Sequence, residues 1–233
     1  MNFDDRYDRQ VKFSPFGERG QRRLGKSRVV IVGCGGLGAN ILNLLTRAGA
    51  GYIRVIDGDK VESGNLHRQV LYTERDVLDG VNKAQVAVQR VSEFNSEVIL
   101  EARVARLSAR NADELLSDVD LILDGTDNFE SRYIINDFAV KTKTPWIYGG
   151  AVGSNAACAV FSPGGPCLRC LWPYPPKADQ LPSGATHGVI ASAPALAASL
   201  QVAAAMRILA GHDPPPVFWK STSGISNAHR SRS

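Results

Sequence analysis

Residues 29–38 read VVIVGCGGLG, an apolar run that passes directly into closely spaced glycines. The segment Val29 to Val32 has the length and composition of a buried parallel strand. The glycines that follow have the spacing G-x-G-x-x-G, and apolar residues recur at helical spacing from Leu37 to Ala48. The stretch therefore predicts a strand, a tight glycine turn and a helix, the unit that opens a nucleotide-binding α/β fold.

The chain continues to alternate strands and helices beyond this unit. We predict strands at 52–56, 98–104 and 119–123, with helices at 83–94, 111–116 and 129–141. A further strand begins at Trp146, and residues 151–161 are predicted to form another one. Alternation of this kind is typical of a Rossmann-like doubly wound α/β fold. We expect a mainly parallel sheet with antiparallel C-terminal strands and a crossover loop.

Four segments are predicted along the chain. The 14 residues from 173 to 186 include four prolines, which predicts an exposed loop. The apolar run 188–211 contains Gln201 and Arg207, which indicates a buried helix rather than a membrane span. The segments are an N-terminal helical arm at 1–27, a nucleotide-binding core at 28–150, C-terminal strands with the crossover loop and a helix at 151–220, and a flexible tail at 221–233.

The composition is that of an ordinary α/β protein. The chain has 233 residues, of which 44% are hydrophobic, and 27 Lys and Arg against 23 Asp and Glu give a net charge of +4. These positive charges form no clustered stripe, so we expect no nucleic-acid partner. The N-terminus begins with acidic residues and lacks an apolar signal core, and the four cysteines do not resemble a disulfide framework. We therefore expect a cytoplasmic protein that does not enter a membrane.

The glycines of the loop have a specific physical role in nucleotide binding. They let the backbone turn tightly and approach a nucleotide, while the N-terminus of the following helix favours anionic groups. Asp57 ends the second predicted strand, where its carboxylate can accept hydrogen bonds from ribose hydroxyls. A strand-to-helix turn without a ligand is the alternative interpretation, and a dehydrogenase would use the same loop and acid. The glycines are Gly33, Gly35, Gly36 and Gly38.

A polar segment, residues 57–69, follows the second predicted strand directly. It is too polar to belong to the core, and a dinucleotide-binding fold would normally continue into an ordinary helix here. Because the carboxyl ends of parallel strands face the ligand crevice, its polar groups can converge on one nucleotide with groups from later strand ends. These groups are Asn65, Arg68 and Gln69 in the segment, Lys83 at the start of a helix, and Asp127-Asn128 after the fourth strand.

Taken in order, these motifs resemble the ThiF/MoeB/HesA family, the bacterial relatives of the ubiquitin-activating enzymes. Each motif is weak alone, but together they are specific, and they cover residues 6 to about 211. The matching segments are Arg6-Tyr7-Asp8-Arg9-Gln10, 33–38, Asp57-Gly58-Asp59, 65–69, Lys83, 124–128 and Cys167-Leu168-Arg169-Cys170.

The resemblance implies a nucleotidyltransferase that adenylates the C-terminal glycine of a ubiquitin-like sulfur-carrier protein ending in Gly-Gly. ATP and Mg²⁺ would be required and pyrophosphate released. Arg68, Lys83 and Asp127 would act in catalysis, with Asp127 holding magnesium, and Arg9 would reach the partner subunit's site in a homodimer. The nucleotide-binding set implied is Gly33, Gly35, Gly36, Gly38, Asp57, Asp59, Asn65, Arg68, Gln69, Lys83, Asp127 and Asn128.

The chemistry agrees with these assignments. A carboxylate attacking the α-phosphate needs positive charge where the transition state concentrates negative charge, and Arg68, Lys83, Arg9 and a cation on Asp127 would supply it. No general base is required, because the carboxylate is already ionised at pH 7. The sequence is also compatible with two other hypotheses about function. The protein could be a nicotinamide-dependent oxidoreductase, or a dimeric binding protein that has lost catalytic turnover.

The cysteines depart from the family pattern. Cys167 and Cys170 correspond to half of a four-cysteine zinc site, and the second C-x-x-C is missing from this sequence. Bound zinc completed in part by His229, a lost zinc site and a reduced thiol pair are all compatible with this pattern. Gly184 stands where some family members carry a cysteine that links to the carrier, so we expect the reaction to end at the acyl-adenylate. We expect Cys34 and Cys158 to be packing residues.

Overall fold

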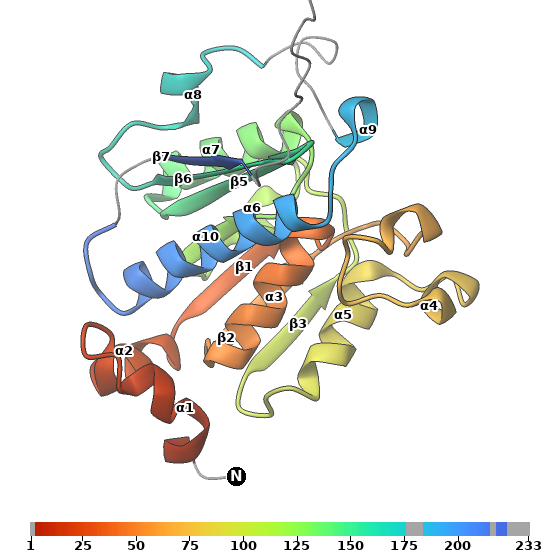
Figure 1. Cartoon of the computed structure of the whole chain (residues 1–233). Helices are drawn as coiled ribbons and strands as arrows, with labels where there is room; N and C mark the ends of the chain where they lie inside the picture. Colours follow the sequence, from red (N-terminus) through yellow and green to blue (C-terminus); the bar gives the residue numbers. More distant parts are fainter. Residues whose placement is uncertain (1–2, 176–183, 215–217, 223–233) are drawn as a thin grey trace, which may run out of the picture.

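A single mixed sheet forms the centre of the computed structural model, which describes residues 3–175, 184–214 and 218–222. The strand order is β3-β2-β1-β4-β5-β6-β7, with parallel pairing from β3 to β5 and antiparallel pairing of β6 and β7 (Figure 1). This confirms the predicted fold class. The strands are β1 Arg28–Val32, β2 Tyr52–Ile56, β3 Ile99–Arg103, β4 Leu121–Asp124, β5 Trp146–Val152, β6 Asn155–Phe161 and β7 Phe218–Thr222.

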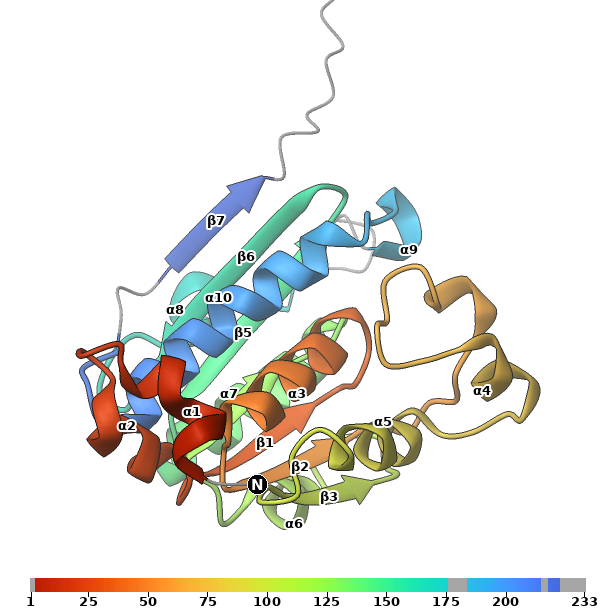
Figure 2. The ribbon, with the colours of Figure 1, turned by 60° about the horizontal axis from the view of Figure 1, so that its bottom comes forward.

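Helices cover both faces of the sheet (Figure 2). One face carries α3 Gly36–Ala48, α5 Lys83–Ser92 and α10 Ser192–Leu209. The other face carries α6 Ala112–Leu116, α7 Phe129–Thr142 and α8 Leu168–Leu171. The N-terminal arm consists of α1 Phe3–Val11 and α2 Gly17–Leu24. The remaining described helices are the 3₁₀ turn η1 Ser63–Asn65, α4 Glu74–Leu78 and α9 Gly184–His187.

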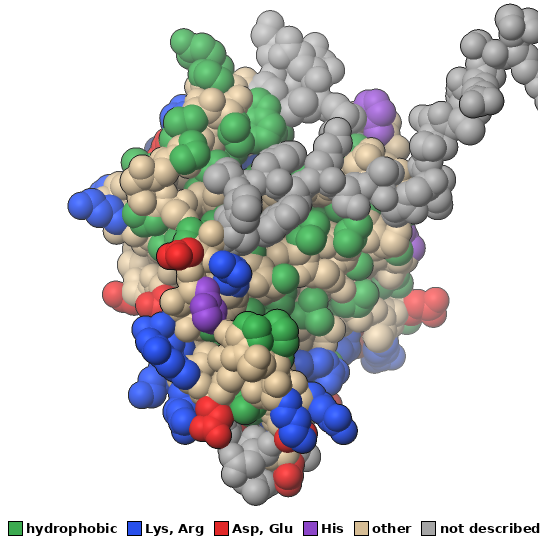
Figure 3. Space-filling view, turned by 60° about the vertical axis from the view of Figure 1, so that its left-hand side comes forward, with side chains coloured by type: hydrophobic (Ala, Val, Ile, Leu, Met, Phe, Trp, Pro, Cys, Tyr) green, Lys and Arg blue, Asp and Glu red, His purple; other side chains and the backbone are tan. Residues whose placement is uncertain are grey.

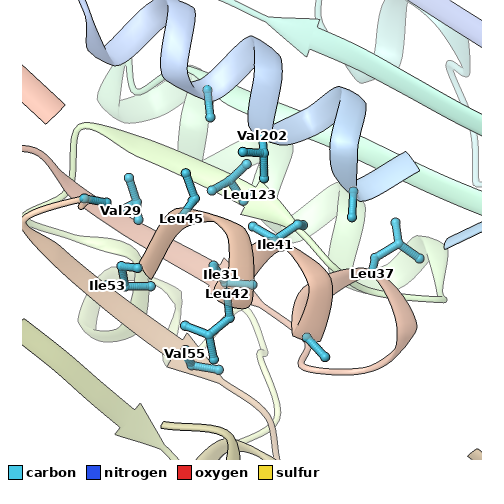
Figure 4. Packing of buried hydrophobic residues seen from close by; sticks show 14 of the residues in the cluster. Val29, Ile31, Leu37, Ile41, Leu42, Leu45, Ile53, Val55, Leu123 and Val202 are labelled. Carbon is cyan, nitrogen blue, oxygen red and sulfur yellow. The ribbon is translucent and has the colours of Figure 1, made fainter. Parts of the chain in front are cut away.

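The core follows from alternation along the buried strands. In β1, Val29 and Ile31 pack towards α3, whereas Val30 and Val32 pack towards α6 and α7 on the opposite face. Figure 4 shows side chains of α3 lying between the strands and α10. Both faces of β1 are apolar because helices cover both, as expected for a central parallel strand.

Helix α10 accounts for the long apolar run near the C-terminus. It is the one helix in the described residues with the length and composition to cross a membrane. Here it packs against α3, β5 and β6 through small side chains such as Ala197 and Ala198, which are fully buried. The predicted buried helix is therefore present.

One predicted strand is wrong. Residues 151–161 do not form a single strand, because β5 continues to Val152, the chain turns at Gly153-Ser154, and β6 returns from Asn155. Gly153 has φ +59°, which suits the tight turn of a two-residue hairpin. The sequence carries a signal for this turn, because Gly153-Ser154 and the polar Asn155 separate two apolar runs.

The predicted segment boundaries fit the structure unevenly. The arm at 1–27 ends where β1 begins, but the boundary at residue 150 falls inside β5, and the strands beyond it extend the same sheet. Part of the predicted proline-rich loop, 176–183, lies outside the described residues, and the helical segment Gly184–His187 begins inside the loop and ends one residue beyond it. Most of the predicted tail also lies outside the described residues.

Candidate nucleotide site

The glycine loop follows β1, and backbone hydrogen bonds hold the start of this loop and the end of β1 against the residues that end β2 and follow β4. The Gly33 N–H donates to Ile56 O at 2.8 Å, and the Gly125 N–H donates to Val32 O at 2.8 Å. A Cβ atom on Gly38 would lie 1.8 Å from Gly33 O, and one on Gly125 would lie 2.5 Å from the same oxygen. Gly33, Gly38 and Gly125 are therefore glycines because three backbone segments pass too close together for any side chain.

Gly35 and Gly36 lie between Gly33 and Gly38 in the loop, and their environment differs from that of those two glycines. A Cβ on Gly35 would meet the Gln69 side chain at 3.5 Å, and one on Gly36 would meet Pro194 at 3.2 Å and Arg68 Cγ at 3.5 Å. These two glycines therefore face the polar residues predicted to bind the nucleotide. A ligand can approach the backbone at this point, at the N-terminus of α3.

Asp57 ties the loop to the end of β2. Its Oδ2 accepts the Cys34 N–H at 2.7 Å, and its Oδ1 accepts the Asp59 N–H at 2.7 Å. Burial raises the pKa of the Asp57 carboxyl, and the two backbone donors and Lys83 oppose that shift. Each carboxylate oxygen keeps a second lone pair, so Asp57 can still accept a hydrogen bond from a ribose hydroxyl.

Arg68 is held in place by its own segment. Its Nη2 donates to Asn65 Oδ1 at 2.8 Å and its Nη1 donates to Gly64 O at 3.2 Å. The guanidinium is thereby fixed within its own segment without an ion pair to any described carboxylate, while the Cγ of Arg68 lies next to Gly36. Gln69 is buried, with its Oε1 unpartnered among the described residues, and Val61 belongs to the hydrophobic core. The expectation that the whole 57–69 segment lies outside the core is therefore wrong at these two positions.

Lys83 is the first residue of α5, which is capped by Asn82. Its side chain is only 8% exposed, and its Nζ lies 3.6 Å from Asp59 Oδ2. Within the described residues no hydrogen bond reaches this ammonium group. A nearly buried cation without hydrogen-bond partners is costly, so the position favours an anionic ligand.

Asp127 and Asn128 follow β4 and are exposed. The Asn128 Oδ1 accepts the Ser131 N–H at 2.9 Å and so caps α7, while its Nδ2 lies 3.5 Å from Asp127 Oδ1. Asp127 offers a carboxylate of the kind that Mg²⁺ shares with phosphates and water. No group of three or more metal-ligating side chains occurs in the described part of the chain.

A buried network beneath the loop was not predicted. Asp124 accepts from Arg132 Nε at 3.0 Å and from the Thr126 hydroxyl at 2.6 Å. Gln201 of α10 donates to Asp124 O at 2.8 Å and to Ile147 O at 3.1 Å. Gln201 was noted in the sequence only as a polar residue in an apolar run, which is the one signal that could have marked it.

Cys167 and Cys170 lie together at the start of α8, with 3.8 Å between their sulfur atoms. Neighbouring ligands in a tetrahedral zinc site are separated by about this distance when each Zn–S bond is about 2.3 Å. The pair therefore fits half of a zinc site. The suggested ligand His229 lies outside the described residues, and so do most residues of the tail.

The other two cysteines are buried, and burial raises the pKa of each thiol to about 12. Cys34 belongs to the glycine loop and its side chain lies in the hydrophobic core, as does that of Cys158 in β6, as expected for packing residues. Gly184, at the position considered for a linking cysteine, begins α9.

Arg9 lies far from the glycine loop of its own chain. Helix α1 packs near the C-terminal end of α3, where Gln10 donates to Ala48 O at 3.0 Å. The loop lies at the other end of this 13-residue helix, a distance of about 20 Å. The Arg9 side chain is 96% exposed. Figure 3 shows one face of the molecule, on which Lys and Arg side chains lie among acidic ones. Arg9 therefore does not join the site of its own chain.

Comparison with known proteins places the chain in a family. The model of the ThiF family matches residues 7–232. The sulfur carrier protein adenylyltransferase of Thermus thermophilus is 43% identical over 217 residues, covering 91% of this chain and 79% of that protein. The sulfur carrier protein ThiS adenylyltransferase of Bacillus subtilis is 41% identical, covering 93% and 66%.

The chain is also similar to longer relatives and to solved structures. The adenylyltransferase and sulfurtransferase MOCS3 of Culex quinquefasciatus is 36% identical over 89% of this chain, which spans about half (47%) of its length. The crystal structure of E. coli MccB with ATP has a TM-score of 0.79 and 25% identity, covering 91% of this chain and 66% of that one. The chain belongs to the ThiF family, as its motifs predicted.

Proposed function

We propose that this chain uses ATP to adenylate the C-terminal carboxylate of a small ubiquitin-like sulfur-carrier protein ending in Gly-Gly, with release of pyrophosphate. The observation that carries the proposal is a pair of cations: Arg68, whose side-chain stem lies against the open Gly36, and the nearly buried Lys83, whose ammonium lies 3.6 Å from Asp59 Oδ2. Two relatives at 43% and 41% identity are named sulfur carrier protein adenylyltransferases. A nicotinamide-dependent oxidoreductase would leave these cations without a function.

The residues suit an in-line attack on the α-phosphorus. The carrier carboxylate is the nucleophile and is ionised at neutral pH, so positioning and charge stabilisation carry the catalysis. As the carboxylate oxygen bonds to phosphorus, the bond to pyrophosphate breaks and negative charge accumulates on the phosphate oxygens. The Lys83 ammonium and the Arg68 guanidinium stabilise this charge from a largely preset geometry.

Asp127 is the residue proposed to hold magnesium. Its exposed carboxylate follows β4 at the same edge of the sheet as the glycine loop, which supports this assignment. The cation would neutralise the polyphosphate and stabilise the leaving pyrophosphate. Asn128 has its carbonyl oxygen engaged in capping α7, so only its amide group remains for the nucleotide.

The active form proposed is a homodimer in which Arg9 of each chain completes the site of the other. The exposure of Arg9 and its distance from its own glycine loop support this arrangement. The product proposed is the acyl-adenylate without a covalent enzyme adduct, since Gly184 supplies no thiol at the family's linking position, Cys34 and Cys158 are buried, and the accessible Cys167 and Cys170 are assigned to zinc. For zinc, only two of the four ligands are proposed, Cys167 and Cys170.

The test of this function is ATP–pyrophosphate exchange measured with a carrier protein. The proposal expects exchange that requires the carrier and binding of ATP in preference to NAD. Preferential binding of NAD, or exchange at the same rate without any carrier, would refute it.

A further inference from the structure

Asp59 stands between two cations near the nucleotide site. Its Oδ2 lies 3.6 Å from the nearly buried Lys83 Nζ, which is beyond hydrogen-bond distance. Its Oδ1 accepts a hydrogen bond from Arg106 Nη2 at 2.8 Å. The carboxylate therefore pairs closely with the exposed cation and only loosely with the buried one. This is the reverse of what charge alone favours, because an ion pair is stronger where water is excluded.

Arg106 is placed to hold the carboxylate in this way. It lies on the connection between β3 and α6, and the Asn111 Nδ2 fixes its backbone by donating to Arg106 O at 3.0 Å. Its stem passes directly over Gly58, where a Cβ atom would come within 2.8 Å of Arg106 Cγ. The glycine before Asp59 thus leaves the space through which Arg106 reaches the carboxylate.

We propose that Arg106 is a positioning residue that holds Asp59 away from Lys83, so that the Lys83 ammonium stays available to the phosphates of ATP. This inference rests on the proposed function, since it takes the site to bind ATP. Without Arg106, Asp59 would close onto Lys83 through a rotation of its side chain, and the ion pair would compete with the ligand. Arg106 acts through Asp59 and does not itself touch the nucleotide.

The experiment measures the dissociation constant of ATP with Mg²⁺ for the full chain and its variants by calorimetry. Arg106→Ala is expected to weaken ATP binding about tenfold, within the usual range of coupling between interacting charged residues. Asp59→Asn removes the competing charge, so adding Arg106→Ala to it should change the affinity less than about twofold. Arg106→Lys should retain most of the affinity. Arg110→Ala, an exposed arginine on the same connection, is the matched control and should bind as the unmodified chain does.

Two results would overturn the inference while leaving the proposed function intact: unchanged ATP affinity in Arg106→Ala, or an equal loss with and without Asp59→Asn. The second result would mean that Arg106 acts on the nucleotide directly. Absence of ATP binding by the unmodified chain would instead overturn the proposed function and this inference with it. Thermal unfolding checks that each variant is folded, and Arg106→Gln carries the same prediction if the alanine variant is not.

Discussion

The guanidinium of Arg132 lies 3.0 Å from the carboxylate of Asp124, and both side chains are buried under the glycine loop. Arg132 also donates to Thr126 O and Gly149 O, each at 2.9 Å. One side chain therefore joins the end of β4, the start of α7 and β5. The loop that carries Asp127 is thus positioned by a buried ion pair.

Replacing Arg132 by alanine should lower the free energy of unfolding by about 3–5 kcal/mol, because Asp124 would remain as a buried charge without its partner. Urea denaturation measures the change. Arg169→Ala breaks an exposed pair with Asp137 on the same helix α7 and should change the free energy of unfolding far less. Similar losses in both variants would show that the buried pair contributes no more to the free energy of unfolding than the exposed pair does.

The pair Asp76–Arg90 should make stability depend on pH. Burial alone would raise the pKa of Asp76, but hydrogen bonds from Arg90 and Thr73 outweigh it and hold the pKa below its ordinary value. The stabilisation is therefore full above the unfolded pKa of about 4 and is lost as the pH falls through the folded value. Asp76→Asn should lower the free energy of unfolding by about 1.5–3 kcal/mol at pH 7.

The difference between Asp76→Asn and the unmodified chain should shrink as the pH falls below about 4. Asp79→Asn, which breaks the exposed pair with Arg75, is the control and should have little effect at either pH. A difference for Asp76→Asn that stays constant down to pH 3 would mean that the carboxylate charge is not the source of the stabilisation.

The four cysteines should react in two classes with a thiol reagent. Burial raises the pKa of Cys34 and Cys158 to about 12, so neither forms a thiolate at pH 8. Burial also acts on Cys167, but backbone N–H groups of Arg169 and Cys170 lower the pKa of its thiol. Mass spectrometry of the folded, metal-free chain should find label on Cys167 and Cys170, and on all four only after denaturation. Rapid labelling of Cys34 would show that the loop opens and that its packing role is wrong.

Subunit mixing tests the proposed role of Arg9. The inactive variants Arg9→Ala and Asp127→Ala should recover activity when mixed, because half of the sites in a heterodimer lack neither group. Pyrophosphate exchange measures the recovery, and light scattering with labelled subunits confirms that exchange of chains has occurred. No recovery despite proven subunit exchange would place Arg9 outside the partner's site.

Local sequence patterns predicted most of the fold because each element carries its own signal. The run at 29–32 and the glycines at 33–38 gave β1 and α3 within a residue or two of their observed bounds. The hairpin at Gly153-Ser154 was missed, although Gly-Ser between two strand-like runs is a hairpin signal, and the antiparallel pairing of β5 with β6 reveals it.

The residues of the candidate site could be predicted from the sequence, but the hydrogen bonds and ion pairs between them could not. Asp57 and Lys83 are predictable because one ends a strand and the other begins a helix. The topology of the fold brings these ends together at one side of the sheet. The bonds from Arg106 to Asp59 and from Arg132 to Asp124 join residues with no shared local pattern. Only the packing of the strand ends shows which of several charged residues form pairs.

The central claim is most directly tested by ATP–pyrophosphate exchange with two forms of one carrier protein, one intact and one lacking its terminal glycine. The account predicts exchange with the intact carrier only, and a loss of about 100-fold in Arg68→Ala, as for removal of one preorganised donor. Arg75→Ala, an exposed arginine on α4, is the control and should exchange normally. Equal exchange with the truncated carrier, or an unaffected Arg68→Ala enzyme, would contradict the account.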